Sequence, residues 1–331
     1  MSGTAPSKNE GGVRLAKAIG LGVLASLFFA STFVLNRVMR LDGSSLWWIS
    51  ALRYFFTVPF LSLIVWRRGG LKTLWNEVVG HPGPWVLWGS IGFGLFYLPL
   101  TWVAGWAPAW LVASSWQLTI VAGSLWVPII GGVDATERRI PMTSLTPSIV
   151  ILIGVGVAEW SASHGSCLCV WWALVPILVA AFAYPLGNRQ MMRYCRQHGG
   201  FDVYQRTLGM TFGSLPFWLV IAAVGAWRSG IPTGSETLDT LLVAVLSGVV
   251  ATLLFFAATD SAQGRAEWLA RIEATQSMEI VFTVLLASLL FGAVWPTPLG
   301  FVGLGLIVIG MVWHSGLYRQ NNTVVGINSS L

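Results

Sequence analysis

Long apolar stretches, separated by short groups of charged residues, dominate this sequence. The stretches are about 17–25 residues long, which is the length that a helix needs to cross roughly 30 Å of hydrocarbon. Only 10% of the residues are charged, against about 25% in an ordinary soluble domain, and the mean hydropathy is +0.71. Strands of a membrane barrel would instead be about 10 residues long and strictly alternating. The pattern therefore predicts an all-α polytopic membrane protein.

The apolar stretches predict ten transmembrane helices. They cover residues 17–37, 46–66, 85–105, 108–130, 146–162, 168–188, 207–227, 239–259, 267–291 and 297–315. Residues 1–16 precede them as a cytoplasmic N-terminal segment, and residues 316–331 follow as a polar, disordered cytoplasmic tail. Residues 70–80 read GLKTLWNEVVG, with apolar and polar side chains on opposite faces at helical spacing. This segment is expected to lie flat in the membrane interface.

The distribution of Lys and Arg predicts the orientation in the membrane. With a cytoplasmic N-terminus, fifteen of the 19 basic residues fall on the inner side, and three, Arg37, Arg40 and Arg228, fall on the outer side. Arg53 alone lies inside a span. Because basic residues favour the cytoplasmic side, both termini are expected in the cytoplasm. The same preference accounts for the net charge of +6 without a nucleic-acid partner.

The two halves of the chain share short motifs in the same order, which predicts an internal repeat. The matching pairs are FVLNR (33–37) with YPLGNR (184–189), Arg53 with Arg206, Trp110-Leu111 with Trp268-Leu269, and Thr146-Pro147 with Thr297-Pro298. Each half, residues 17–162 and 163–315, contains five predicted helices. Because five is odd, the second copy would cross the membrane in the opposite sense. Inverted repeats of this kind are the architecture of many secondary transporters.

Three segments, ASTFVLNRVM, SLWWISALRYFFTVPFL and WLVASSWQLTIVAGSLWVPII, resemble the ten-helix branch of the drug/metabolite transporter superfamily. They are most similar to its bacterial multidrug-resistance efflux family. The resemblance covers roughly residues 17–315. It implies a membrane transporter that exports a small molecule, with proton exchange as a driving force.

Ionisable groups within a membrane helix must face protein, water or a partner, so each one is a functional candidate. At 1.5 Å per residue, Arg53 lies about 10 Å, Gln117 about 13 Å and Glu279 about 12 Å below the outer surface. Glu159 in the fifth predicted span comes out at a similar depth. These four polar groups, together with the deep Trp116, therefore form the predicted substrate- or proton-binding layer.

Each candidate has a functional and a structural interpretation. Glu279 is either a carboxylate that binds a proton or cation, or one half of an ion pair with Arg53. Arg53 binds either that carboxylate or an anionic substrate group. Gln117 hydrogen-bonds to substrate or to a neighbouring helix, and Trp116 offers a face for cation–π contact. Glu159 lies either in the binding layer or at the outer headgroups.

The leading hypothesis is an exporter of small amphipathic or cationic compounds. An exporter of amino acids or related metabolites is the alternative, favoured if Arg53 is unpaired. An intramembrane enzyme is disfavoured because the sequence lacks GxSxG, HExxH and a pair of intramembrane Asp residues. No cofactor or metal is expected, since the three cysteines lack CxxC spacing and the four histidines are scattered singly. The expected partners are a small-molecule substrate, a proton or other coupling ion and the lipid bilayer, while the oligomeric state stays open.

Overall fold

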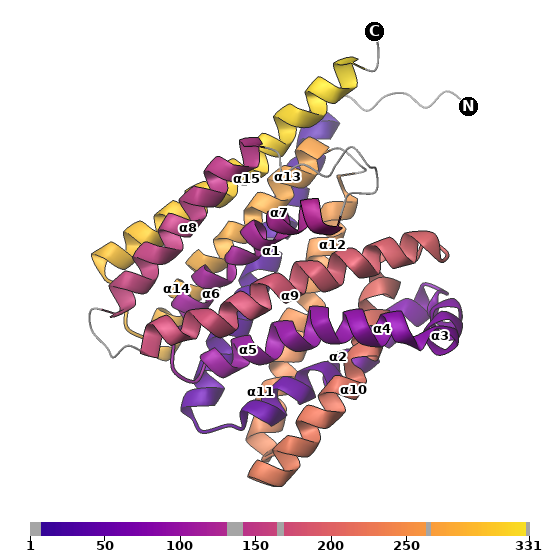
Figure 1. Cartoon of the computed structure of the whole chain (residues 1–331), viewed down its shortest axis with the longest axis vertical. Coiled ribbons are helices and arrows are strands. Elements are labelled where there is room, and N and C mark those ends of the chain that lie inside the picture. The colour runs from indigo at the N-terminus through magenta and orange to yellow at the C-terminus, as the bar shows by residue number, and fades with distance from the viewer. Residues whose placement is uncertain (1–7, 131–141, 164–168, 263–265, 329–331) are drawn as a thin grey trace.

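The computed structural model describes residues 8–130, 142–163, 169–262 and 266–328, and the regular elements in these ranges are all helices (Figure 1). Nine helical runs within these ranges are long and apolar enough to cross a membrane. They are Val13–Leu41, Leu46–Arg67, Pro82–Val103, Ala109–Ile130, Leu145–Ser163, Val203–Ser229, Gly234–Asp260, Arg271–Phe291 and Pro298–Ser315. Each coincides with a predicted span. The remaining prediction, residues 168–188, falls on a 29-residue helix that is not among the nine.

The described residues of the first half of the chain form eight α-helices and one π-helical segment. These are α1 (Lys8–Leu41), α2 (Leu46–Arg67), α3 (Leu71–Gly80), α4 (Pro82–Gly89), η1 (Ser90–Gly94), α5 (Leu95–Val103), α6 (Ala109–Trp116), α7 (Leu118–Ile130) and α8 (Met142–Ser163). The helix α3 is the predicted interfacial segment. It buries Leu74 and leaves Lys72 and Trp75 exposed, as expected of an amphipathic helix.

The second half has a similar order of helical elements. Its elements are α9 (Cys169–Gln197), α10 (Val203–Ser229), α11 (Gly234–Val243), η3 (Ala244–Ala251), α12 (Thr252–Asp260), α13 (Ala266–Ala274), η4 (Thr275–Ser277), α14 (Met278–Phe291) and α15 (Pro298–Asn328). The last helix continues to Asn328, through most of the segment for which the sequence predicts a disordered tail.

Helix ends outside the apolar stretches are set by local sequence. Asp202 and Gln205 form a capping box at the start of α10, and Thr233 and Glu236 form another at the start of α11. Each box pairs two backbone N–H groups that the first turn of a helix leaves free. Gly292 ends α14 in the left-handed conformation, with φ of +62°, which glycine adopts at no steric cost. These signals fix where three of the long helical runs begin or end.

Four helical runs are interrupted near their middle, at matching places in the two halves. The π-helical η1 joins α4 to α5, and the π-helical η3 joins α11 to α12. The helices α6 and α7 meet at Gln117, and the 3₁₀ turn η4 joins α13 to α14. An alignment that places Trp110 on Trp268 also places Gln117 on Thr275 and overlaps η1 with η3. Interruptions of this kind often mark functional hinges and sites.

Contacts between the helices also occur in matched sets. The helix α1 packs against α12 and α14, and α9 packs against α5 and α7, which hold the corresponding places in the other half. In the same way α2 packs against η3, and α10 packs against η1. The corresponding helices α8 and α15 contact each other and lie side by side along one edge of the molecule (Figure 1).

Glycine allows several of these crossings to be close. A Cβ atom on Gly187 of α9 would lie 2.5 Å from the Cα atom of Gly92 in η1, so the two backbones are in direct contact. Gly213 of α10 lies against the backbone carbonyl of Trp85 in α4. Small residues at such positions let membrane helices approach closely. Gly92 therefore has a packing role in this crossing.

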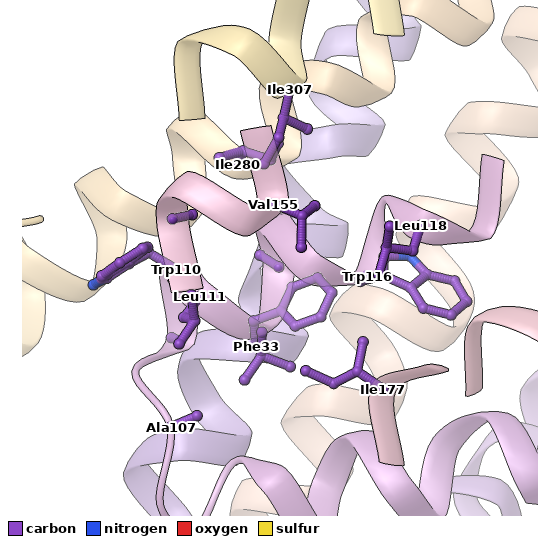
Figure 2. Packing of buried hydrophobic residues seen from close by; sticks show 14 of the residues in the cluster. Phe33, Ala107, Trp110, Leu111, Trp116, Leu118, Val155, Ile177, Ile280 and Ile307 are labelled. Atoms are coloured by element: carbon purple, nitrogen blue, oxygen red, sulfur yellow. The ribbon is translucent and has the colours of Figure 1, made fainter. Parts of the chain in front are cut away.

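A large cluster of buried apolar side chains surrounds α6 (Figure 2). Its members come from α1, α5, α6, α7, α8, α9, α14 and α15 and include Phe33, Trp110, Leu111, Trp116, Val155, Ile177, Ile280 and Ile307. Trp110 and Trp116 lie on opposite sides of this cluster (Figure 2). Trp116 is thereby placed at the end of α6 that leads into the interruption at Gln117.

Candidate functional site

Glu279 and Gln117 meet where two interrupted helical runs come together. Glu279 lies in the first turn of α14, directly after η4, and is only 8% exposed. The side chain of Gln117 lies close enough to its carboxyl group to interact with it. The Gln117 amide nitrogen donates to the backbone oxygen of Ala113, at 3.2 Å. The break between α6 and α7 thus brings a polar side chain to the first turn of α14.

Trp116 belongs to a group of three rings beside this carboxyl group. The ring centres of Trp116, Phe96 and Tyr184 lie 4.8 Å (Trp116 to Phe96), 5.4 Å (Trp116 to Tyr184) and 4.9 Å (Phe96 to Tyr184) apart. We call these residues the aromatic triangle. Glu279 lies close enough to the Tyr184 hydroxyl to interact with it electrostatically. The triangle therefore adds aromatic faces to the site, and its Phe96 and Tyr184 were not predicted from the sequence.

Arg53 is buried in α2, with 9% of its surface exposed. Its Nη2 donates to the Ser247 hydroxyl of η3 at 3.0 Å, and its guanidinium carbon lies 4.0 Å from the centre of the Tyr97 ring. Its Nη1 is buried without a hydrogen-bond partner. Within the described ranges no carboxylate forms an ion pair with Arg53. The predicted alternative, an ion pair with Glu279, is therefore not formed in this structure.

Tyr97 connects Arg53 to the rest of the site. Its ring is fully buried, and its hydroxyl donates to the Asn36 side-chain oxygen of α1 at 3.0 Å. Its neighbour Phe96 belongs to the aromatic triangle, and the ring centres of Phe96 and Tyr97 lie 6.1 Å apart. A continuous row of aromatic rings thus leads from the Arg53 guanidinium to the surroundings of Glu279.

Glu159 is fully buried in α8, next to the exposed Trp160. The Ser115 hydroxyl donates to its Oε1 at 2.8 Å, and its Oε2 has no hydrogen-bond partner. Because Ser115 and Gln117 flank Trp116, the carboxyl groups of Glu159 and Glu279 are attached to the same short break. The structure thus connects four of the predicted residues directly through this break, and connects Arg53 to them through Tyr97.

The chain also matches known proteins over most of its length. A family model described as "EmrE: Putative multidrug resistance efflux transporter" matches residues 16–320. The chain belongs to this family. It is therefore a multi-pass membrane protein of an efflux transporter family, with a small molecule as substrate and the lipid bilayer as environment.

Two similar proteins occur in bacteria. An uncharacterized protein of Bacillus subtilis (strain 168), YjlA, is 46% identical over 308 residues, which cover 90% of this chain and 94% of YjlA. An uncharacterized 42.1 kDa protein of Shouchella clausii is 45% identical over 269 residues, which cover 80% of this chain and 70% of that protein. One solved crystal structure aligns with a TM-score of 0.62 over 92% of this chain and 98% of its own, at 16% identity. At that identity the likeness shows the fold alone.

Proposed function

We propose that this protein is a secondary transporter that exports small amphipathic or cationic compounds across the cytoplasmic membrane in exchange for protons. The observation that carries this proposal is the placement of Glu279 beside the aromatic triangle. A carboxylate next to aromatic faces suits an organic cation, because the charge is neutralised and the rings add cation–π attraction. No enzymatic step is part of the proposal.

Exchange follows from the chemistry of a single buried carboxyl group. Glu279 neutralises either a proton or an organic cation, and binding of one displaces the other. Ionisable groups of this kind within the membrane commonly mark ion pathways and proton relays. The Gln117 amide interacts with this carboxyl group and would help to hold it beside the rings. Competition at Glu279 would therefore couple the two fluxes.

The proposal includes two inverted repeats, residues 17–162 and 163–315, that move against each other. The matched interruptions and the matched helix contacts support a duplication, and the five helical runs in each copy imply opposite orientations. Gln117 belongs to the first copy and Glu279 to the second. A site shared by both copies in this way would open to either side of the membrane as one repeat rocks against the other.

Export of amino acids or related metabolites is a second candidate. The unpaired Nη1 of Arg53 favours it, because such substrates carry a carboxylate.

A transport assay in proteoliposomes tests the proposal. Vesicles containing the purified protein and an acidic interior should accumulate ethidium, a fluorescent organic cation, from a neutral external buffer. A protonophore that collapses the gradient should abolish the accumulation. If a panel of organic cations shows no gradient-driven accumulation although the protein melts cooperatively, proton-coupled cation export is wrong.

A further inference from the structure

We propose that Arg53 forms an anion-binding subsite, which takes the carboxylate of a substrate whose basic group lies at Glu279. The inference rests on the proposed transport function and narrows its substrate class. The favoured substrates would be compounds that carry one acidic and one basic group on an apolar body, rather than simple cations.

The first argument is the unmet hydrogen-bonding capacity of Arg53. A guanidinium group within a membrane helix ordinarily pairs with a carboxylate or with backbone oxygens. The Nη2 of Arg53 contacts only the neutral Ser247 hydroxyl, and its Nη1 has no partner at all. Buried donors of this kind are rare in native proteins and call for an explanation. The planar fork of a guanidinium group matches both oxygens of a carboxylate.

Two other arginines show how this fold satisfies such a group when its role is structural. Nη1 of Arg37 donates to the backbone oxygen of Ala104 at 3.0 Å. Nη1 of Arg40 donates to the backbone oxygen of Ser44, and Arg40 also interacts with the charge of Glu236, although its Nε is buried without a partner. Within the described residues, Arg53 donates to no backbone oxygen and forms no ion pair with an acidic side chain.

The second argument is that Arg53 is held in one position. The Tyr97 ring lies against its guanidinium group, the Ser247 hydroxyl holds Nη2, and Asn36 holds the Tyr97 hydroxyl. These contacts come from α5, η3 and α1, while Arg53 itself lies on α2. A donor that is already oriented loses little freedom when its ligand binds. The positive group is thus prepared for an anion before the anion arrives.

The third argument is the row of rings between the two charged groups. Tyr97 contacts Arg53, its neighbour Phe96 lies in the aromatic triangle, and the triangle adjoins Glu279. A substrate with an apolar middle would cover these rings while its two ends neutralise Arg53 and Glu279. A simple cation would leave the positive charge of Arg53 uncompensated nearby, which disfavours it relative to a zwitterion.

Three matched probes test this subsite on the full-length protein in lipid nanodiscs. They are 4-(2-aminoethyl)benzoate, 2-phenylethylamine, which lacks the carboxylate, and 4-ethylbenzoate, which lacks the amine. An equivalent trio with a biphenyl body extends the length range. Equilibrium binding should give one of the two zwitterions at least tenfold tighter affinity than the corresponding amine, which is about 1.4 kcal/mol. Arg53→Gln should remove that preference and leave the affinity for the amine within about threefold.

Controls separate binding from folding. Arg228→Gln alters an exposed arginine beyond the binding layer and should change none of the affinities. Arg53→Lys keeps the charge without the fork, so it should show an intermediate preference, and it replaces Arg53→Gln if the latter fails to fold. Glu279→Gln should weaken the amine and the zwitterion alike.

The subsite is wrong if the zwitterion and the amine bind the unaltered protein equally, if Arg53→Gln weakens both equally, or if no zwitterion of either trio binds. Either of the first two results is compatible with transport of the amines driven by a proton gradient. The proposed function would then stand without the subsite. Conversely, a tenfold zwitterion preference without any gradient-driven transport would leave the subsite intact and contradict the proposed function.

Discussion

Ser115 donates a 2.8 Å hydrogen bond to Glu159 from a position two residues before Gln117, which is the partner of Glu279. One short break between α6 and α7 therefore touches two buried carboxyl groups on two different helices, α8 and α14. Any movement of this break changes the surroundings of both groups together. Its side chains are accordingly where substitutions should be most informative.

Replacing Ser115 with alanine should destabilise the protein. The change leaves both carboxyl oxygens of the fully buried Glu159 without a partner, which costs about 1–3 kcal/mol of the free energy of unfolding. Ser114→Ala is the matched control, because Ser114 is equally buried but donates only to the Leu111 carbonyl of its own helix. Thermal denaturation in detergent should show a clear loss for Ser115→Ala alone. Equal losses for both variants would mean that the contact with Glu159 contributes nothing specific.

Glu279→Gln should abolish gradient-driven export while protein abundance stays near normal. The amide keeps the shape of the side chain and can still bond to Gln117, but it cannot take up or release a proton. Glu273→Gln is the control, since Glu273 lies six residues earlier in the same helical run and is exposed. Uptake by proteoliposomes, normalised to reconstituted protein, measures the effect. Normal transport by Glu279→Gln across the pH range would remove Glu279 from coupling.

Gly213→Ala should strongly impair folding. The added Cβ atom would collide with the backbone of Trp85, and a backbone atom cannot turn aside as a side chain can. Overpacking of this kind costs about 1–3 kcal/mol or more. Gly156→Ala is the control, because nothing lies within 4 Å of its added Cβ. The two variants should differ in membrane yield and in melting temperature. Indistinguishable values would contradict the close contact between α4 and α10.

Reporter fusions should place the C-terminus in the cytoplasm. The expectation rests on the fifteen to three distribution of Lys and Arg. A green fluorescent protein fused after Leu331 should fluoresce, and alkaline phosphatase fused there should be inactive. Fusions truncated after Gly230, close to the outer Arg228, should give the reverse result. A fluorescent fusion at Gly230 and an active phosphatase at Leu331 would overturn the orientation and the cytoplasmic termini.

The positions of the long helices were predictable because burial in lipid leaves a strong mark on composition. Nine predicted spans and the interfacial segment after residue 70 coincide with helices. Two capping boxes mark where α10 and α11 begin, and Gly292 marks where α14 ends. The interruptions η1 and η3 were not predictable. Their residues are as apolar as their neighbours, and whether a turn is α-helical or π-helical depends on the packing around it.

The site was predictable only where a polar group is costly in lipid. Glu279, Gln117, Arg53 and Glu159 stand out from the sequence for that reason, but their pairing does not, because depth along a helix says nothing about direction around it. The expected partner of Glu279, Arg53, is instead held by Tyr97 and Ser247. Tyr184 carried a usable signal, since it takes the place of Phe33 in the matching motifs of the two halves.

The contact between Gly92 and Gly187 has a mechanical consequence. The two glycine backbones touch directly, with the end of the Met210 side chain next to Gly92, so we expect the helices to roll over one another there more readily than where ridges packed into grooves resist sliding. We expect this crossing to act as a pivot. Phe96 lies four residues beyond it on one helical run, and Tyr184 lies three residues before it on the other. A small roll about this pivot would widen or narrow the gap between the two rings. It would thereby change how closely they contact a substrate bound beside Glu279.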